Sequence, residues 1–338
     1  MIDFLITDLE AGRSLTRAEA EAVMDELLSG QVGTPEIARL LAALRSRPYT
    51  VDELVGFALS MRRHVAPVFR PDEPLPEHLV DTCGTGGDES GTFNISTAAA
   101  IVAAAAGARV AKHGNRSVSS RCGSADVLEA LGVRIDLPPE RAGAAIREIG
   151  IGFLFAPAAH RSTRHASEAR KQLGGRTIFN LLGPLTNPAG ARFQVVGVFS
   201  ADVLDLVASA LAELGANRAF VVHGAGGLDE ISLAGESLVA EVRAGTVRRY
   251  TVAPEEFAVN RVALDALRGG DPTGNAALIR QILSGEQGPP RDVVVVNTAA
   301  ALVAAGVADS FRDAAKCATA ALDSGAAAAK LAALAAWS

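Results

Sequence analysis

Residues 81–97, DTCGTGGDESGTFNIST, join a short apolar run to an alanine-rich segment. Three glycines fall within four consecutive positions, and glycine lets a backbone approach a ligand closely and turn several N–H groups toward it. Asn94, Ser96 and Thr97 stand at the start of the following helix, where unpaired N–H groups and the helix dipole favour negative charge. The dinucleotide fingerprint would need a third glycine in place of Glu89, and the P-loop would need a lysine. The stretch therefore predicts an anion site of a different type.

The chain that follows alternates short apolar runs with helical stretches. These runs are HLVDT (78–82), ARVAKH (108–113), GFLFA (152–156), QVVGVFS (194–200), AFVVHG (219–224) and DVVVVN (292–297). Apolar strands separated by helices indicate a mostly parallel sheet that is covered on both faces. We therefore expect the α/β fold class, with a larger α/β domain around a central, mostly parallel sheet and a small all-helical domain.

The N-terminal part of the chain carries helical signals only. Thr16 precedes an amphipathic stretch and Glu19 follows three residues later, which is the pattern of a capping box, and Gly30 ends the stretch. Two further helices are expected at 34–44 and 52–64. Four prolines within the segment PVFRPDEPLPE exclude a helix there and indicate a linker.

One later segment interrupts the alternation of strands and helices. Residues 160–188 predict helix and loop without a strand, so we expect this segment to pack back on the N-terminal helices and make the helical domain discontinuous. The expected domains are a helical domain at 1–70 plus about 160–190, and an α/β domain at 71–159 plus 191–338.

Composition limits the class of protein. Hydrophobic residues make up 49% and charged residues 21% of the 338 positions, as in a globular protein with a large core. A net charge of −6 argues against a nucleic-acid surface, and three cysteines without metal spacing favour a reducing compartment. The N-terminus lacks a signal-peptide pattern, and no apolar run reaches the roughly 18 residues of a membrane span. We expect a cytoplasmic protein with no nucleic-acid partner and no membrane partner.

A local excess of positive charge follows the glycine-rich stretch. No acidic residue occurs between Glu89 and Asp126, although the chain as a whole is acidic. The basic residues in this interval are Arg109, Lys112, Arg116 and Arg121. The segment KHGNRSVSSRCGSAD (112–126) follows the second expected strand, and carboxyl ends of parallel strands place ligand sites. Its donors suited to phosphate and ribose oxygens are Asn115, Ser117, Ser119, Ser120 and Ser124.

Two adjacent acids, Asp229 and Glu230, follow another expected strand in VVHGAGGLDEISL. Mg²⁺ prefers one or two carboxylates together with substrate phosphates, so beside a polyphosphate pocket this pair is a candidate metal site. No pairing of a nucleophile with a base stands out, and His113 is the one histidine at a ligand position. The others are expected mostly at the surface or as helix caps: His64, His78, His160, His165 and His223.

Six ordered motifs carry a resemblance to a known family. They are DTCGTGGD, NIST, KHGNRSVSS, GSADVLEALG, RTIFNLLGPLTNP and VHGAGGLDE. In this order, over nearly the whole chain, they resemble the anthranilate phosphoribosyltransferases. The resemblance implies a fold of the nucleoside phosphorylase/phosphoribosyltransferase type and transfer of a phosphoribosyl group from phosphoribosyl pyrophosphate to the amine of anthranilate. It also implies Mg²⁺ as cofactor and, together with the apolar faces of the N-terminal helices, a homodimer formed through the helical domain.

The resemblance also implies roles for individual residues. The expected contacts of phosphoribosyl pyrophosphate are Gly84, Gly87, Asp88, Thr92, Asn94, Ser96, Thr97, Lys112, Asn115, Arg116, Ser119, Ser120 and Ser124. The expected contacts of anthranilate are Gly84, His113, Asn115 and Arg170. The expected Mg²⁺ ligands are Ser96, Asp229 and Glu230. The expected catalytic residues are Lys112, His113 and Asn115.

The chain departs from the family pattern in three places. Residues 159–163 are AHRST where many members have HHPAM, which bears on the shape of the acceptor channel. Cys122 replaces a usual serine, and Gly175 replaces a usual valine or a similar residue. Two other protein classes would show different sequence features. A pyrimidine nucleoside phosphorylase would carry a KxSTGG loop, and a catalytically silent, nucleic-acid-binding relative would lose KHGN or GLDE and gain a basic stripe.

Overall fold

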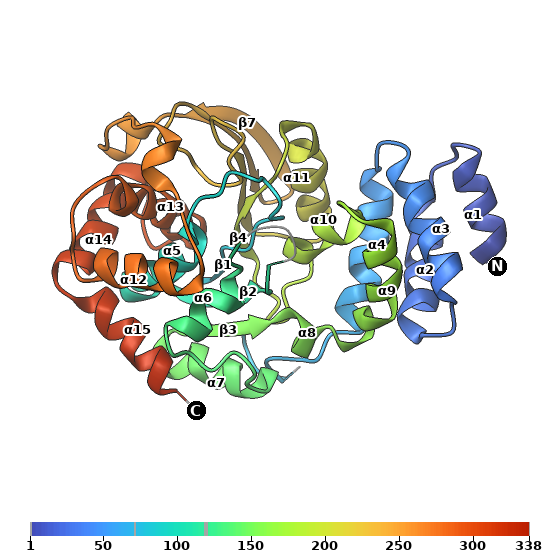
Figure 1. Cartoon of the computed structure of the whole chain (residues 1–338), viewed down its shortest axis with the longest axis horizontal. Coiled ribbons are helices and arrows are strands. Elements are labelled where there is room, and N and C mark those ends of the chain that lie inside the picture. Colours follow the sequence, from blue (N-terminus) through green and yellow to red (C-terminus); the bar gives the residue numbers. More distant parts are fainter. Residues whose placement is uncertain (1, 71, 118–120, 338) are drawn as a thin grey trace.

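The computed structural model describes residues 2–70, 72–117 and 121–337. A small helical part lies beside a larger part built around a sheet, which confirms the expected fold class (Figure 1). The helical part begins with α1 (Ile2–Glu10), α2 (Arg17–Ser29), α3 (Thr34–Arg45) and α4 (Val51–Arg63). The capping box at the start of α2 is confirmed, because the Glu19 N–H donates to the Thr16 hydroxyl and the Thr16 N–H donates to the Glu19 carboxylate.

The larger part contains a seven-stranded sheet in the order β3-β2-β1-β4-β5-β6-β7. Its strands are β1 (Leu79–Asp81), β2 (Arg109–Gly114), β3 (Ile151–Phe155), β4 (Phe193–Gly197), β5 (Arg218–His223), β6 (Ser237–Arg243) and β7 (Thr246–Val252). The first five strands run parallel, whereas β6 and β7 are antiparallel to their neighbours. The strand order reverses between β1 and β4, and such a switch point is where open α/β sheets bind ligands.

Helices cover both faces of the sheet (Figure 1). The helices of the α/β part are α5 (Ile95–Ala105), α6 (Ser124–Ala130), α7 (Pro139–Ile149), α11 (Leu204–Glu213), α12 (Pro272–Leu283), α13 (Pro289–Ala305), α14 (Phe311–Asp323) and α15 (Ala326–Ala336). The larger core lies where α5, α13, α14 and α15 pack together, while α11 shares a second core with α4. None of the helices in the described part of the chain combines the length and apolar character that crossing a bilayer requires.

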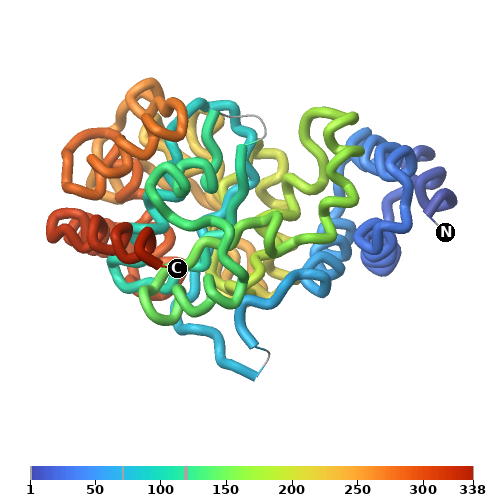
Figure 2. The backbone as a smooth tube through the Cα atoms, turned by 60° about the horizontal axis from the view of Figure 1, so that its bottom comes forward, coloured from blue at the N-terminus to red at the C-terminus, as the bar shows by residue number. Residues whose placement is uncertain are grey.

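A mid-chain segment returns to the N-terminal helices. It contains α8 (Ala156–Ala159), a 3-10 helix (Arg161–Ala166), α9 (Ser167–Leu173) and α10 (Ile178–Leu185). Ala166 and Ala169 are buried in the same hydrophobic cluster as residues of α2, α3 and α4. Figure 2 shows this green segment running beside the blue N-terminal helices.

Two expectations about strands were wrong. The run DVVVVN forms part of α13 instead of a strand. Two prolines start the helix just before this run. The helix is buried on all sides, and in such a position a β-branched run packs as well as it does in a sheet. The hairpin of β6 and β7 was missed, and its turn is Ala244–Gly245. Both turn residues have positive φ, 49° and 80°, as a two-residue hairpin turn requires.

The crossing of α2 and α4 provides a test of packing. A Cβ placed on Gly56 would lie 2.4 Å from the Arg17 carbonyl oxygen and 2.8 Å from the Ala20 Cβ. We expect Gly56→Ala to lower the free energy of unfolding by about 1–3 kcal/mol through overpacking, despite alanine's better helix propensity. Urea unfolding followed by circular dichroism measures this. Gly183→Ala in α10 is the matched control, because nothing lies within 4 Å of its added Cβ. Equal midpoints for both variants would contradict the expectation.

Candidate active site

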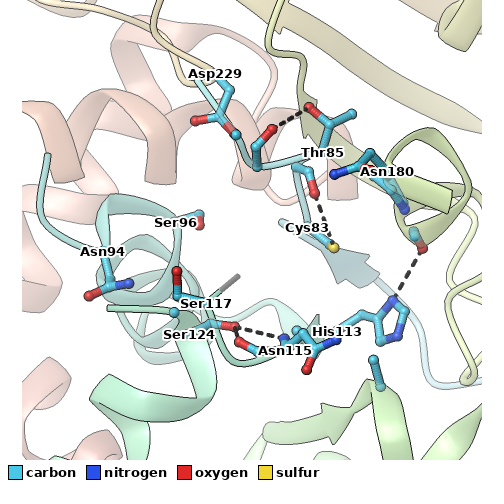
Figure 3. Close-up of a pocket in the computed structure, with 18 of the residues that line it drawn as sticks. Cys83, Thr85, Asn94, Ser96, His113, Asn115, Ser117, Ser124, Asn180 and Asp229 are labelled. Carbon is cyan, nitrogen blue, oxygen red and sulfur yellow. Dashed lines mark hydrogen bonds between the residues drawn. The ribbon is translucent and has the colours of Figure 1, made fainter. Parts of the chain in front are cut away.

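A cavity of about 390 Å³ opens at the carboxyl ends of the central strands, between the α/β part and the returning helices (Figure 3). The structure brings most of the expected site residues together here. Those that line it are Gly84, Gly87, Asp88, Thr92, Asn94, Ser96, Thr97, Lys112, His113, Asn115, Arg116, Ser124, Arg170, Asp229 and Glu230. Ser119 and Ser120 lie outside the described residues.

The glycine-rich loop forms the rim of this cavity. Gly86 and Gly87 have φ values of 63° and 78°, a backbone conformation that side chains disfavour. The loop is held to the end of β4, because the Thr85 N–H donates to the Gly197 carbonyl at 2.8 Å and the Thr85 hydroxyl accepts from the Phe199 N–H at 3.1 Å. The loop is therefore anchored at its base while its glycines face the cavity.

Lys112, near the carboxyl end of β2, supplies a buried positive charge. Its side chain is 4% exposed, and its Nζ donates to the Thr82 carbonyl at 2.8 Å and to the Ser96 hydroxyl at 3.4 Å. The ammonium group therefore joins β1, β2 and the N-terminus of α5 at one point. Its charge works to lower the pKa of Glu230, but burial outweighs it and raises that pKa to about 7.

Three carboxylates, those of Asp88, Asp229 and Glu230, meet at one wall of the cavity. Burial, followed by repulsion from Asp88 and Glu230, raises the pKa of Asp229 well above its usual value. The Asp229 N–H donates to the Asp88 carboxylate at 3.3 Å, and the Ser96 N–H donates to the Glu230 carboxylate at 3.1 Å. Desolvated acids that repel one another are stabilised by a divalent cation, and Mg²⁺ takes oxygen ligands of this type. Asp229, Glu230 and the Ser96 hydroxyl thus fit a magnesium site.

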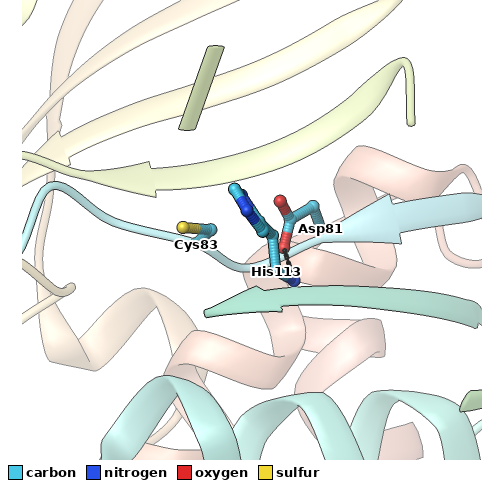
Figure 4. A group of neighbouring side chains, drawn as sticks. All are labelled: Asp81, Cys83 and His113. Atoms are coloured by element: carbon cyan, nitrogen blue, oxygen red, sulfur yellow. Dashed lines mark hydrogen bonds between the residues drawn. The ribbon is translucent and has the colours of Figure 1, made fainter. Parts of the chain in front are cut away.

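A second group of possible metal ligands lies deeper (Figure 4). Ligand atoms of Asp81, Cys83 and His113 lie within 4.8 Å of one another. Both Asp81 oxygens are already engaged, because they accept from the His113 N–H at 3.1 Å and from the Asn187 amide at 2.7 Å. Burial also raises the pKa of the Cys83 thiol to about 12, which opposes a thiolate. We assign this group a structural role, in which Asp81 ties β1 to β2 and to Asn187.

Two buried histidines, His113 and His160, line the part of the cavity next to α10. His160 stands at a helix cap, where α8 ends and the 3-10 helix begins, but it is buried: it is 6% exposed, and its ring centroid lies 5.2 Å from that of His113. The Nε2 atoms of both rings are buried and lack a hydrogen-bond partner among the described residues. Burial lowers the pKa of His113 to about 3 and that of His160 to about 4, so both rings are neutral at pH 7. The signal that sequence reasoning missed is the position of His160 directly after the third strand and α8.

Arg170 and Arg176 reach the site from the returning segment. The guanidinium of Arg170 lies 4.9 Å from the Phe179 ring centroid, and burial lowers its pKa without an offsetting carboxylate. Arg176, which sequence reasoning also missed, donates to the Gly87 carbonyl and stacks on Phe199 at 4.4 Å. The arginine at the start of RTIFN thus connects the glycine-rich loop to the segment that carries α9 and α10.

Several of the remaining expected residues are already bound to other groups of the protein. Arg116 lines the cavity but forms ion pairs with Asp126 at 2.8 Å and with Glu129 at 3.0 Å. Asn115 and Ser124 hold each other, since the Asn115 N–H donates to the Ser124 hydroxyl at 3.2 Å. Arg109, part of the basic interval, lies elsewhere and donates to carbonyls at the end of α7. The positive charge near the cavity therefore comes mainly from Lys112 and Arg170.

Known families match the chain in both of its parts. The model described as "Glycosyl transferase family, helical bundle domain" matches residues 5–65, and the one described as "Glycosyl transferase family, a/b domain" matches residues 76–328. The anthranilate phosphoribosyltransferase of Moorella thermoacetica is 51% identical over 337 residues, covering 100% of this chain and 98% of the relative. That of Solibacter usitatus is 54% identical over 321 residues, covering 95% and 94%.

Solved structures agree with these relatives. The anthranilate phosphoribosyltransferase of Thermus thermophilus superposes with a TM-score of 0.91 at 46% identity and covers 98% of each chain. The enzyme of Saccharomyces cerevisiae, solved in complex with phosphoribosyl pyrophosphate and Mg, gives a TM-score of 0.86 at 28% identity and covers 95% of this chain and 92% of its own. With this identity along its whole length and the same two-part fold, the chain belongs to the anthranilate phosphoribosyltransferase family.

Proposed function

We propose that this protein transfers the phosphoribosyl group of phosphoribosyl pyrophosphate to the amine of anthranilate. The bond from C1 of the ribose to pyrophosphate breaks, a bond from the anthranilate nitrogen to C1 forms, and the amine loses a proton. The observation that carries this proposal is the division of one cavity into two chemically different sides. Lys112, the glycine-rich loop and a carboxylate cluster lie on one side, and Arg170 with two neutral histidines lies on the other.

The donor side suits a polyphosphate that leaves with its bonding electrons. Backbone N–H groups of the glycine-rich loop and of the α5 N-terminus attract the phosphate oxygens. Lys112, already fixed by two hydrogen bonds, stabilises the negative charge that develops on the leaving group. Bound at Ser96, Asp229 and Glu230, Mg²⁺ would supply further neutralisation of the pyrophosphate charge.

The acceptor side suits a flat aromatic amine with one carboxylate. The planar guanidinium of Arg170 grips a carboxylate through two parallel hydrogen bonds. The Nε2 of His113, which has no hydrogen-bond partner among the described residues, is assigned as the acceptor for the amine, because the Nδ1 lies 3.2 Å from the Gly183 carbonyl and therefore carries the ring proton. His113 thus aligns the attacking nitrogen, and Asn115 lies beside it at the end of β2.

Domain organisation, assembly and location extend the proposal. We assign 1–70 plus about 160–190 to a discontinuous helical domain and 71–159 plus 191–338 to the α/β domain, supported by the burial of α9 against α3. We also assign a homodimer formed through the helical domain, supported by the 71% exposure of Phe4 on α1. A cytoplasmic location agrees with the cysteine-poor composition.

A fluorescence assay tests the activity directly. The loss of anthranilate fluorescence is followed with phosphoribosyl pyrophosphate and Mg²⁺, and then without each of them. We expect anthranilate consumption in the complete mixture only. An enzyme that binds both substrates but consumes no anthranilate at micromolar protein concentration would refute the proposed reaction.

The metal site predicts opposite effects on activity and stability. Asp229→Asn and Glu230→Gln should each lower the turnover at least about 10-fold and raise the Mg²⁺ concentration needed for half-maximal rate. Without Mg²⁺, the melting temperature should hold or rise, because each change removes a desolvated charge from a repelling cluster. Asp309→Asn, an exposed site, is the matched control. Wild-type Mg²⁺ dependence in both site variants would place the metal elsewhere.

The acceptor side predicts a separation of the two Michaelis constants. Arg170→Ala should raise the KM for anthranilate by about 10- to 100-fold, since a hydrogen bond to a charged group is worth roughly 1.5–3 kcal/mol. The KM for phosphoribosyl pyrophosphate should stay within about twofold of the wild-type value. The anthranilate KM of Arg170→Lys should lie between those of wild type and Arg170→Ala, because lysine keeps the charge but loses the bidentate geometry. Arg164→Ala is the control, since Arg164 is exposed on the same segment. Steady-state kinetics with each substrate varied in turn would reject the assignment if both constants rose together.

A further inference from the structure

Asn94 stands at the N-cap of α5 but does not cap that helix with its side chain. Its Nδ2 instead donates to the Cys122 carbonyl at 3.0 Å, and its Oδ1 accepts from the Nδ2 of Asn275 at 2.9 Å. Asn275 lies on the first turn of α12, far away in sequence, and is 2% exposed. The Oδ1 of Asn275 in turn accepts from the Gly270 N–H at 2.6 Å. These four groups form one relay of hydrogen bonds.

The two ends of the relay determine the orientation of both amides. The Gly270 N–H can only donate and the Cys122 carbonyl can only accept, so each asparagine has one orientation that satisfies both of its neighbours. In this orientation the Asn94 oxygen points to Asn275 and one Nδ2 hydrogen points to Cys122. The second Nδ2 hydrogen has no acceptor among the described residues, and Asn94 lines the donor side of the cavity. The relay therefore presents an N–H and keeps the carbonyl oxygen away from a bound anion.

The segment that precedes α12 holds this relay against the glycine-rich loop. The Phe93 N–H donates to the Leu267 carbonyl at 3.2 Å, and the Gly269 N–H donates to the Gly91 carbonyl at 2.9 Å. A Cβ on Gly269 would lie 2.7 Å from both the Cα and the N of Phe93, so the two backbones can approach this closely only with glycine there. The backbone just before Asn275 is therefore fixed to the glycine-rich loop, and this places the Asn275 side chain against Asn94.

We infer that Asn275 is a positioning residue for the donor side of the site, which acts by holding the Asn94 amide with its N–H toward the pyrophosphate group. The inference rests on the proposed function. Asn275 itself is buried behind Asn94 and contributes no atom to the lining of the cavity. Because Asn94 also binds the Cys122 carbonyl, the same relay ties the end of the β2–α6 loop to the start of α5.

The test compares Asn275→Leu with wild type by steady-state kinetics and by calorimetric titration with phosphoribosyl pyrophosphate and Mg²⁺. Leucine has nearly the shape of asparagine but cannot donate to Asn94. We expect the KM and Kd for phosphoribosyl pyrophosphate to rise about 10-fold or more, while the anthranilate KM stays within about twofold. Asn260→Leu, an exposed asparagine of the same domain, is the matched control. Melting temperatures show whether each variant is folded.

A double-mutant cycle separates positioning from general damage. Asn94→Ala should weaken donor binding similarly, and adding Asn275→Leu should weaken it little further, because the inference assigns the effect of Asn275 on the donor to Asn94, although Asn275 also contacts the Cys122 thiol. Independent, multiplying effects would overturn the inference, as would equal rises in both Michaelis constants. If Asn275→Leu does not fold, Asn275→Asp replaces it, since aspartate keeps the acceptor for Gly270 but loses the donor. Failure of both to fold assigns Asn275 a structural role and also overturns the inference.

The same titration distinguishes the inference from the function on which it rests. Wild-type protein that does not bind phosphoribosyl pyrophosphate with Mg²⁺ would remove both the proposed function and the inference. Wild type and Asn275→Leu that bind it equally well would remove the inference alone. Weaker binding by the variant, with anthranilate affinity preserved, supports both.

Discussion

The site depends on one buried ammonium group. Lys112 donates to the Thr82 carbonyl and the Ser96 hydroxyl, so a single side chain joins the ends of two strands to the start of a helix. A buried lysine is costly unless charges of opposite sign lie near it, and Asp81 and Glu230 are close enough for its field to act on both. The two carboxyls keep raised pKa values because burial outweighs that field. The site therefore holds opposing charges that a charged substrate and a cation can satisfy together.

The opposing charges of the site come from separate segments of the chain. Positive charge comes from β2 and from the returning segment, whereas the carboxylates come from the loop after β5 and from the glycine-rich loop. The cavity is lined by residues of both hydrophobic cores, such as Phe93 and Ile95 of one and Met61 and Phe179 of the other. Arg176 crosses that boundary through its bond to the Gly87 carbonyl. The segment that carries α9 and α10 is therefore hydrogen-bonded to the glycine-rich loop.

Much of this arrangement could be predicted from the sequence, because the motifs fall at the carboxyl ends of parallel strands, where chain direction alone brings them together. The five parallel strands and the helices α2, α3 and α4 carried clear local signals. The buried run DVVVVN did not, since a β-branched stretch that is apolar on all sides suits either a strand or a buried helix. His160 and Asn275 were missed for another reason. Neither lies in a recognisable motif, and their importance comes only from what the folded chain places beside them.

The hairpin of β6 and β7 has a consequence for the behaviour of the protein at high concentration. β7 is the outer strand of the sheet, and an outer strand offers unpaired backbone groups to any strand that approaches. Arg248 and Arg249 are consecutive in the middle of this strand and point to opposite faces of the sheet, and the Arg249 side chain is 54% exposed where it pairs with Asp205. Charged side chains on an outer strand disfavour pairing with a second copy that approaches edge to edge. This edge is thus protected against sheet extension and aggregation, which leaves association to other surfaces.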